Sequence, residues 1–453
     1  MGSKEIQFAS DYLILKPEEA TLLDLFLFVL PFGFKNLRKL VDCPPEKEES
    51  YNSFGNRWII FFSILWQKIL LAFLNQHKEK PKTEDPPTVN CKDWSLSGRD
   101  KNIKLDDPFQ YYAILSVRAS ALATEDFSPH PSVVETVVNS CWNMKLLGCY
   151  DLWNDFQDMG STQVFMFQNT ATDPNVTVVA FRGTTDVYDM KVDLDFSWYE
   201  IANVGKIHRG FMEALGLQKQ LGWPKELVKP EHDYAYYFLR QQLRDIAKSN
   251  DKARFIITGH SLGAALATLF VTILAFHEEL DLLEKLKAVY TFGQPRVGDV
   301  QFVQFMENVN SKVHKFPYYR YVYSMDVVPR IPFDVEGDQW YKHFGGCLYY
   351  DCNYTGEFLE EEPNKNYLSI PWLIPKYLYA WWELLRSLLL PVIMCNPDYF
   401  ETSQIFYARV FGLFIPGASA HNVVNYIYSA RWGKIVCRDT QKKVIPADYL
   451  ERC

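Results

Sequence analysis

The most informative segment of the sequence is Arg254-Phe-Ile-Ile-Thr-Gly-His-Ser-Leu-Gly-Ala-Ala-Leu-Ala-Thr268. Its apolar run from Phe255 to Thr258 predicts a short buried β-strand, and the small and apolar residues after the turn predict a helix from Leu262 to about His277. Between the two lies Gly259-His-Ser-Leu-Gly263, which matches the G-x-S-x-G pattern of a nucleophile elbow. The motif requires this order of strand, tight turn and helix, so the stretch predicts a nucleophilic serine at the end of a buried strand.

Ser261 is placed by this prediction at the N-terminus of the helix. Unpaired backbone N–H groups and the helix dipole favour negative charge there, and acyl transfer develops such a charge. Gly259 and Gly263 fit a turn in which backbone approaches backbone too closely for a Cβ atom. The alternative is a structural Gly-Ser turn, but the small residues of the following helix suit close packing on a sheet and favour the elbow.

The composition of the 453-residue chain indicates one large domain with appendages. Hydrophobic residues make up 48% and aromatic residues 16% of the chain, which is ample material for a large core. The net charge of −8 gives no reason to expect a nucleic-acid partner. The nine cysteines form no C-x-x-C pair and no metal-ligand spacing, so we expect mostly reduced thiols, no metal and no cofactor. The oligomeric state stays open.

Residues 1–105 are unlike the rest of the chain and predict a hydrophobic region that associates with a membrane or lipid droplet, followed by a linker. Thr21–Leu30 and Trp58–Leu74 are apolar runs, and Lys78–Asn102 is charged and rich in proline, as linkers are. The N-terminus lacks the basic-then-apolar order of a signal peptide, which argues for the cytosolic face of a cell.

The apolar run Trp58–Leu74 has a polar side when it is drawn as a helix. The polar residues on that side are Ser63, Gln67, Lys68 and Asn75. The polar side favours a helix that lies in a lipid interface over one that spans a bilayer. A helix buried against the main domain explains the run equally well at this point.

Residues 106–453 have the pattern of a mixed α/β domain. The predicted strands are Gln163–Gln168, Val176–Arg182, the elbow strand, Ala288–Phe292 and Tyr318–Ser324. The predicted helices are Ser132–Leu147, Arg209–Leu221, His232–Ser249, the elbow helix and one from Asp299 to about Asn310. Because strands alternate with helices, the sheet should be mostly parallel, with its functional end at the carboxyl ends of the strands.

A serine nucleophile needs a histidine base and an acid that holds the histidine, in the chain order Ser, acid, His. Asp326 follows a predicted strand and precedes a proline-containing loop, so it is the preferred acid. Asp299 is the rival, but it opens a predicted helix and suits an N-cap better.

The base is one of two histidines. His421 lies in Gly417–Asn425, a loop that enters a helix late in the chain, and it is the preferred base. His343 is the rival and lies in a run that resembles returning β-structure. His260 is inside the elbow and should support Ser261 by a hydrogen bond, whereas His208 has no role beyond packing.

The oxyanion of a tetrahedral intermediate needs two donors. One is the backbone N–H of Leu262, the residue after the nucleophile. The other should come from a loop after an early strand, where Thr184 follows a glycine and offers both an N–H and a hydroxyl. The loop continues into Asp186–Leu194, an amphipathic segment of the length of a lid.

Four motifs in order give the chain a specific resemblance to a known family. They are Phe181-Arg-Gly-Thr184, Gly259-His-Ser-Leu-Gly263, Gly293-Gln-Pro-Arg-Val-Gly-Asp299 and Asp326-Val-Val-Pro329. With these, the chain resembles the class 3 lipases, the fungal-lipase-like branch of the α/β-hydrolases. The resemblance implies a mostly parallel central sheet flanked by helices, here with an N-terminal apolar helical region and a hydrophobic insertion.

The resemblance also implies roles for individual residues. It assigns Ser261, Asp326 and His421 as the catalytic triad and Thr184 and Leu262 as the oxyanion hole. The lid would run from Thr185 to Leu194, and its residues would include Val187, Tyr188, Met190 and Asp193, the last as its anchor.

Tyr12-Leu-Ile-Leu-Lys-Pro-Glu18 and the sequence around His421 are similar, more narrowly, to the plant oil-body triacylglycerol lipases of the castor-bean acid lipase type. This implies a triacylglycerol substrate and an address on the cytosolic face of a lipid droplet, with the endoplasmic reticulum membrane as a second location. The alternatives are a phospholipase A1 or galactolipase on membrane lipids and an inactive droplet-binding protein.

An aromatic-rich insertion around residues 345–400 separates the acid from the base. Within it, the pattern of Lys376–Leu390 predicts a helix with a narrow polar stripe. The residues outside the stripe are mostly Leu, Tyr and Trp. The stripe consists of Lys376, Glu383, Arg386 and Ser387. Paired tryptophans beside a few charges are typical of an interfacial helix, so we expect this segment and Trp58–Leu74 to contact the droplet or membrane surface. A buried core helix is the alternative.

Overall fold

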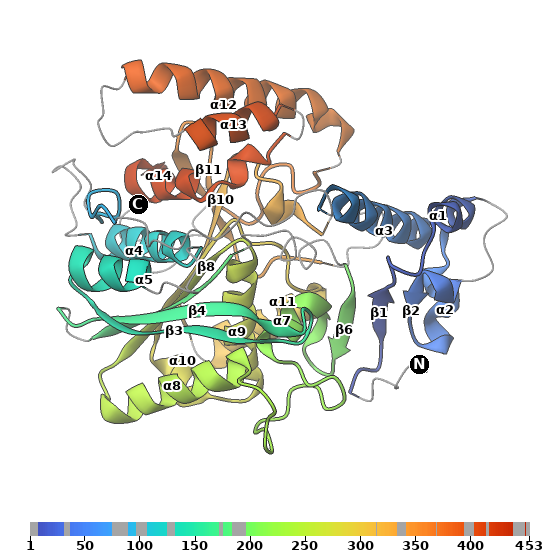
Figure 1. Cartoon of the computed structure of the whole chain (residues 1–453), viewed down its shortest axis with the longest axis horizontal. Coiled ribbons are helices and arrows are strands. Elements are labelled where there is room, and N and C mark those ends of the chain that lie inside the picture. Colours follow the sequence, from blue (N-terminus) through green and yellow to red (C-terminus); the bar gives the residue numbers. More distant parts are fainter. Residues whose placement is uncertain are drawn as a thin grey trace.

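The computed structural model describes residues 8–30, 37–74, 89–96, 107–124, 132–171, 175–183, 196–313, 315–332, 341–367, 369–393, 403–413, 416–437 and 449. These residues form a nine-stranded central sheet with helices on both faces and a second, four-stranded sheet at one side (Figure 1). The central sheet has the order β13-β12-β11-β10-β9-β8-β5-β4-β3. The fold is that of an α/β-hydrolase, as predicted.

The strands of the central sheet whose carboxyl ends form the site are parallel. The sheet consists of β3 (Lys145–Asn154), β4 (Met159–Asn169), β5 (Val176–Phe181), β8 (Arg254–His260), β9 (Leu286–Phe292), β10 (Tyr318–Tyr323), β11 (Cys347–Tyr350), β12 (Thr355–Leu359) and β13 (Lys434–Ile435). Each neighbouring pair in the run β5, β8, β9, β10 and β11 is parallel, whereas β3 with β4, β4 with β5 and β11 with β12 are antiparallel. The register pairs Phe181 with Gly259 and Gly259 with Thr291, so the carboxyl ends of three strands lie side by side.

Helices cover both faces because the central strands are apolar on both sides. In β5, Val179 and Phe181 face one core with α7 (Arg209–Leu215), α8 (Ala235–Ser249) and α9 (Leu262–Phe276). Val178 and Ala180 face the other core with α4 (Pro108–Leu122) and α14 (Val423–Trp432). The smaller helices are α5 (Ser132–Glu135), α10 (Leu280–Glu284) and α11 (Val300–Asn308). Figure 1 shows α8 and α10 on the opposite side of the sheet from α4 and α14.

The N-terminal segment joins the hydrolase part by strand pairing. The second sheet has the order β2 (Val41–Asp42), β1 (Tyr12–Leu15), β6 (Trp198–Ile201) and β7 (Gly205–His208). Strand β1 pairs antiparallel with β6, with Leu13 opposite Trp198, and the Leu15 N–H donates to Ser197 Oγ at 2.9 Å. The two sides of the predicted boundary at residue 105 therefore share a sheet. Of the predicted linker, only residues 89–96 lie within the described part of the chain.

The N-terminal helices have a core of their own. They are α1 (Leu22–Val29), α2 (Glu48–Tyr51) and α3 (Phe54–Leu74), and the core includes Leu25, Phe28 and Ile60 together with Trp198 and Tyr341 of the hydrolase part. The predicted polar side of α3 faces inward, because Ser63 and Gln67 are both buried. Among the described residues, no helix combines the length and the hydropathy that crossing a bilayer requires.

The insertion between β12 and α14 contains α12 (Leu373–Ile393) and α13 (Ser403–Phe411). Figure 1 shows α12 as the outermost layer of the molecule, lying over α13 and α14. The helix covers the whole predicted segment from Lys376 to Leu390 and extends it at both ends.

Two local predictions are wrong for identifiable reasons. The helix expected over residues 132–147 ends in a π-turn at Cys141, because Lys145 already begins the long strand β3. The helix expected to reach Leu221 ends at Leu215, because Gly216 has a φ of +100° and caps it.

The expectation of mostly reduced thiols holds for four of the seven described cysteines, and the other three are disulfide-bonded. Cys91 forms a disulfide with Cys141 over a Cα–Cα distance of 5.0 Å, and Cys437 is disulfide-bonded too. The free thiols among the described residues are those of Cys43, Cys149, Cys347 and Cys352. The spacing of these cysteines carried no sign of the pairing, because it depends on the tertiary fold.

Leu25→Ala and Leu23→Ala form a matched test of how α1 is seated. Leu25 is fully buried, whereas the side chain of Leu23 on the same helix is 68% exposed. We expect Leu25→Ala to lower the free energy of unfolding by about 2 to 5 kcal/mol and Leu23→Ala to change it by less than about 0.5 kcal/mol. Thermal and denaturant unfolding of the two purified variants measures the difference, and equal losses would contradict the packing described above.

Candidate active site

The elbow forms where β8 runs into α9. Ser261 is the N-cap of α9 and has φ +58° and ψ −129°, a conformation that is costly for a residue with a side chain. A Cβ atom on Gly259 would lie 2.2 Å from the carbonyl carbon of Gly263, and one on Gly263 would lie 2.4 Å from the Phe181 carbonyl oxygen. Both predicted glycines are therefore required by close backbone contact. The Ser261 N–H donates to the Phe292 carbonyl at 2.9 Å, which ties the elbow to β9.

The structure brings the three predicted triad residues into one hydrogen-bonded chain. His421 Nε2 lies 2.8 Å from Ser261 Oγ, and His421 Nδ1 lies 2.8 Å from Asp326 Oδ2. His421 ends a short 3-10 turn, Ser419–His421, directly before α14, which is the loop entering a helix that the sequence predicts. With Nδ1–H donating to the carboxylate, Nε2 is left as the acceptor for the serine proton.

Asp326 is fully buried and held as a carboxylate. Burial alone would raise its pKa, but the charge and hydrogen bond of His421, with further hydrogen bonds from the Tyr426 hydroxyl and the Val328 N–H, lower it below the ordinary value. Arg330 fixes the loop by donating to the backbone carbonyls of Asp326 and Ser324. An ionised acid can therefore stabilise the imidazolium that forms when His421 accepts a proton.

The rivals take structural positions. Asp299 caps α11, since its Oδ1 accepts from the Phe302 N–H at 2.9 Å. The side chain of His343 is buried, and its Nε2 donates to the Pro329 carbonyl at 2.7 Å. Burial and then the nearby Arg320 charge lower its pKa to about 3.

His260 supports the base rather than the nucleophile. Its Nε2 donates to the backbone carbonyl of His421 at 2.9 Å, and the two rings stack with centroids 4.6 Å apart. Burial and then the His421 charge lower the pKa of His260 to about 3, so this ring stays neutral beside the catalytic one. The prediction that His260 supports Ser261 by a hydrogen bond is wrong, because the Nε2 of His260 bonds to the backbone carbonyl of His421 instead. His208 stacks on Phe211 at 4.0 Å, as the packing prediction implied.

Leu262 begins α9 directly after Ser261, the position that an oxyanion donor requires. The predicted second donor, Thr184, lies outside the described residues. The predicted lid residues lie outside them as well; these are Val187, Tyr188, Met190 and Asp193. Gly183 is the last described residue before them, and a Cβ atom on it would lie 2.6 Å from the His260 carbonyl oxygen. The end of β5 thus lies against the elbow.

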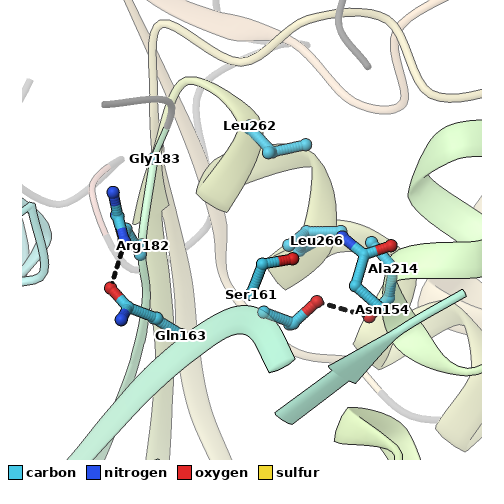
Figure 2. Close-up of a pocket in the computed structure, with 9 residues that line it drawn as sticks. Asn154, Ser161, Gln163, Arg182, Gly183, Ala214, Leu262 and Leu266 are labelled. Atoms are coloured by element: carbon cyan, nitrogen blue, oxygen red, sulfur yellow. Dashed lines mark hydrogen bonds between the residues drawn. The ribbon is translucent and has the colours of Figure 1, made fainter. Parts of the chain in front are cut away.

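A small pocket lies beside the elbow, lined by Gly183, Leu262 and Leu266 on one side and by polar residues of β3 and β4 on the other (Figure 2). Figure 2 shows Arg182 and Gln163 side by side in this lining, joined by a hydrogen bond. The Arg182 N–H also donates to the Gln163 carbonyl at 2.9 Å. The backbone directly before Thr184 is therefore fixed to β4, a contact that the sequence did not reveal.

Comparison with known proteins agrees with this geometry. Residues 178–336 match the family described as Lipase (class 3). Triacylglycerol lipase OBL1 of Arabidopsis thaliana is 34% identical, and the match covers 94% of this chain and 95% of that protein. The chain belongs to the class 3 lipase family. A triacylglycerol lipase of Ricinus communis is 38% identical over 71% of this lipase and 64% of its own length.

Among solved structures, the Rhizomucor miehei lipase in complex with its propeptide matches this lipase with 23% identity and a TM-score of 0.40. The match covers 56% of this chain and 69% of that one. As a member of this family, the protein is a serine hydrolase. No cluster of His, Cys, Asp and Glu in the described part of this lipase could bind a metal ion.

The buried histidines predict how the stability of this lipase depends on pH. His343 has a pKa of about 3 in the folded protein against 6.5 for the free group, so between these values the unfolded chain binds a proton that the folded protein does not. The free energy of unfolding therefore falls by about 1.4 kcal/mol per pH unit for such a group as the pH falls below 6.5. We expect the unfolding temperature to fall less steeply in His343→Gln than in the wild type between pH 6.5 and 4.5. An equal fall of the unfolding temperature in His343→Gln and the wild type would contradict this expectation.

Proposed function

We propose that the protein is a triacylglycerol lipase that hydrolyses acylglycerol esters at the surface of a lipid droplet. The observation that carries the proposal is the Ser261–His421–Asp326 chain, with 2.8 Å between the base and each of its partners. The name of the Arabidopsis relative, which is similar over nearly the whole chain, supports the substrate class.

The geometry suits an acyl-enzyme mechanism. His421 Nε2 removes the proton of Ser261 Oγ as the oxygen attacks the ester carbonyl, and Asp326 stabilises the resulting imidazolium. The imidazolium then gives its proton to the departing alcohol, which leaves the acyl group on Ser261. A water molecule gives a proton to His421 and attacks the acyl carbonyl, and the fatty acid leaves as the serine regains its proton.

The proposed oxyanion hole consists of the Leu262 N–H and Thr184. The position of Leu262 at the start of α9 and the contact of Gly183 with the elbow support this assignment. The loss of one such donor costs about 3 to 4 kcal/mol of transition-state stabilisation. We also keep the segment from Thr185 to Leu194, with Asp193 as its anchor, as the proposed lid.

Helix α12 supports attachment to a lipid surface because its polarity is inverted. The polar stripe that the sequence indicates is buried: Lys376, Glu383, Arg386 and Ser387 all face the protein. The outward face is apolar and exposed, with Ile374 at 72%, Leu378 at 64% and Trp381 at 53%. A helix that exposes leucines and tryptophans and buries its charges suits an apolar boundary.

Helix α1 also exposes apolar side chains and buries a charge, although its inner side includes Leu25 and Phe28. Asp24 is buried and bonded to Lys39 and Thr21, whereas Leu23 and Phe26 are exposed. In α3, Phe62 is exposed, but much of the described part of the helix packs inward. We therefore propose α1 and α12 as the main contacts with the droplet, and the droplet rather than the endoplasmic reticulum membrane as the address.

Ser261→Ala tests the catalytic assignment. We expect this change to lower the release of fatty acid from emulsified triacylglycerol by roughly four to six orders of magnitude, because the nucleophile is lost. The assay runs in parallel on phospholipid and galactolipid vesicles. If Ser261→Ala is as active as the wild type, the triad assignment is wrong. Serine-dependent release that is faster from vesicles would move the substrate to membrane lipids.

Trp381→Ser combined with Leu385→Ser tests the surface assignment. Both side chains are about half exposed on the outward face of α12, so the change removes apolar contacts with lipid while the buried side of the helix stays intact. We expect binding to a triacylglycerol emulsion, measured by flotation, to fall at least about tenfold. Leu221→Ser is the control, since its side chain is 71% exposed between α7 and α8. Equal flotation of both variants would refute the contact, and thermal unfolding confirms that each is folded.

A further inference from the structure

A cluster of buried charges lies under α12, between this helix and the catalytic residues. Glu383 and Arg386 of α12 and Arg409 of α13 have exposed fractions of 3%, 4% and 2%. Arg386 Nη2 donates to Glu383 Oε2 at 3.0 Å, and Arg409 Nη1 donates to the same oxygen. Buried charges are costly, and apolar residues of similar size often fill such a position at least as well.

One path leads from Glu383 to the loop that carries His421. Arg409 bridges Glu383 and Asn425, because its Nη2 donates to Asn425 Oδ1 at 3.3 Å. Asn425 Nδ2 then donates to the backbone carbonyls of Ser419, at 3.1 Å, and Ala420, at 3.3 Å. These two residues directly precede His421. The position of the base is thus connected to α12 by an unbroken series of hydrogen bonds.

A second path leads from Glu383 toward the acid. Glu383 Oε1 accepts from the Tyr323 hydroxyl at 2.7 Å, and Arg386 Nη2 donates to the same hydroxyl at 2.9 Å. Tyr323 is the last residue of β10 and lies three residues before Asp326. Its backbone N–H donates to the Tyr426 hydroxyl, which itself donates to the Asp326 carboxylate. One carboxylate on α12 is therefore linked to both partners of Ser261.

The first turn of α12 holds the same loop from another side. Lys376 donates to the backbone carbonyl of Tyr367, and the Tyr367 hydroxyl donates to the Pro416 carbonyl at 2.6 Å. The next residue, Gly417, has φ +93°, and a Cβ atom on it would lie 2.1 Å from the Met325 carbonyl oxygen. The loop of the base and the loop of the acid are therefore packed directly on each other beneath this helix.

We propose that Glu383 and Arg409 are positioning residues for His421, so that the seating of α12 on the protein sets the geometry of the triad. The inference rests on the proposed function and extends it, because the helix that contacts lipid then also determines how well the base is placed. Displacement of a catalytic group by about 1 Å can cost on the order of 100-fold in rate. A cluster that only stabilised the insertion would have no such effect on each folded molecule.

Glu383→Gln and Arg409→Lys in the full-length protein test the proposal. The first removes the charge that holds Arg409, and the second keeps a charge beside Glu383 but lacks the fork that also reaches Asn425. The substrate is a soluble short-chain ester, so lipid binding does not enter the measurement. Titration with a reactive phosphonate counts the serines that are competent in each preparation. Glu361→Gln is the matched control, because this carboxylate is 44% exposed and pairs with Lys365 at the surface.

We expect kcat per titrated serine to fall about 10- to 100-fold in Glu383→Gln and by a smaller factor in Arg409→Lys, while KM changes less than about threefold. The labelling by phosphonate should be slower but should reach the wild-type end point, and Glu361→Gln should match the wild type. If Glu383→Gln does not fold, Tyr323→Phe removes only the hydroxyl between Glu383 and Arg386, and a fall in kcat of about fivefold is expected.

An unchanged kcat per titrated serine in Glu383→Gln and Arg409→Lys, or in Tyr323→Phe where that variant is needed, would overturn the proposal. Fewer titrated serines with full activity each would assign the cluster a purely structural role, which overturns it as well. The wild type and Ser261→Ala are measured in the same assay. A wild type without serine-dependent turnover would remove the proposed function itself and is thereby distinguished from failure of the positioning role.

Discussion

At the elbow, the backbone of β8 passes so close to α9 that a Cβ atom on Gly259 would lie 2.2 Å from the carbonyl carbon of Gly263. This contact forces the chain through Ser261 with a positive φ and leaves the serine at the start of a helix. The strained turn persists because the core on both sides of the sheet, built from strands such as β5 and β9, fixes where β8 and α9 can lie. Asp326 follows β10 and meets the site of Ser261 because the carboxyl ends of parallel strands share one edge, whereas the turn before α14 brings His421 there.

The insertion solves a different physical problem. In water a helix buries its apolar side, but α12 buries Glu383 and Arg386 and exposes Trp381 and Leu385. Both halves of this arrangement are unfavourable for a protein surrounded by water on that side, since charges lose hydration and apolar area stays wet. The outward half becomes favourable when the apolar side chains leave water at a lipid surface. The buried charges of α12 are satisfied by hydrogen bonds that continue toward the triad. The exposed and the buried side of the helix therefore act together.

The central chemistry could be predicted from the sequence because short motifs carry it. The G-x-S-x-G turn identified Ser261, and the chain order of a triad, with a strand end before a proline loop, selected Asp326 over Asp299. Contacts between distant segments were not predictable in the same way. The pairing of Leu13 with Trp198, like the burial of the polar stripe of α12, depends on which surfaces the fold brings together. A helical wheel shows a stripe but not the direction it faces.

The described residues on either side of the proposed lid are held by different parts of the molecule. Before it, Arg182 is fixed to Gln163 of β4, within the hydrolase sheet. After it, Ser197 accepts from the Leu15 N–H, and the next residue enters the strand that pairs with β1. The N-terminal segment therefore holds the chain just after the proposed lid. The same segment carries the apolar face of α1. Strand β1 and helix α1 also share a buried core with Trp198, the residue after Ser197. The N-terminal segment thus helps to fix the path of the chain beside the site.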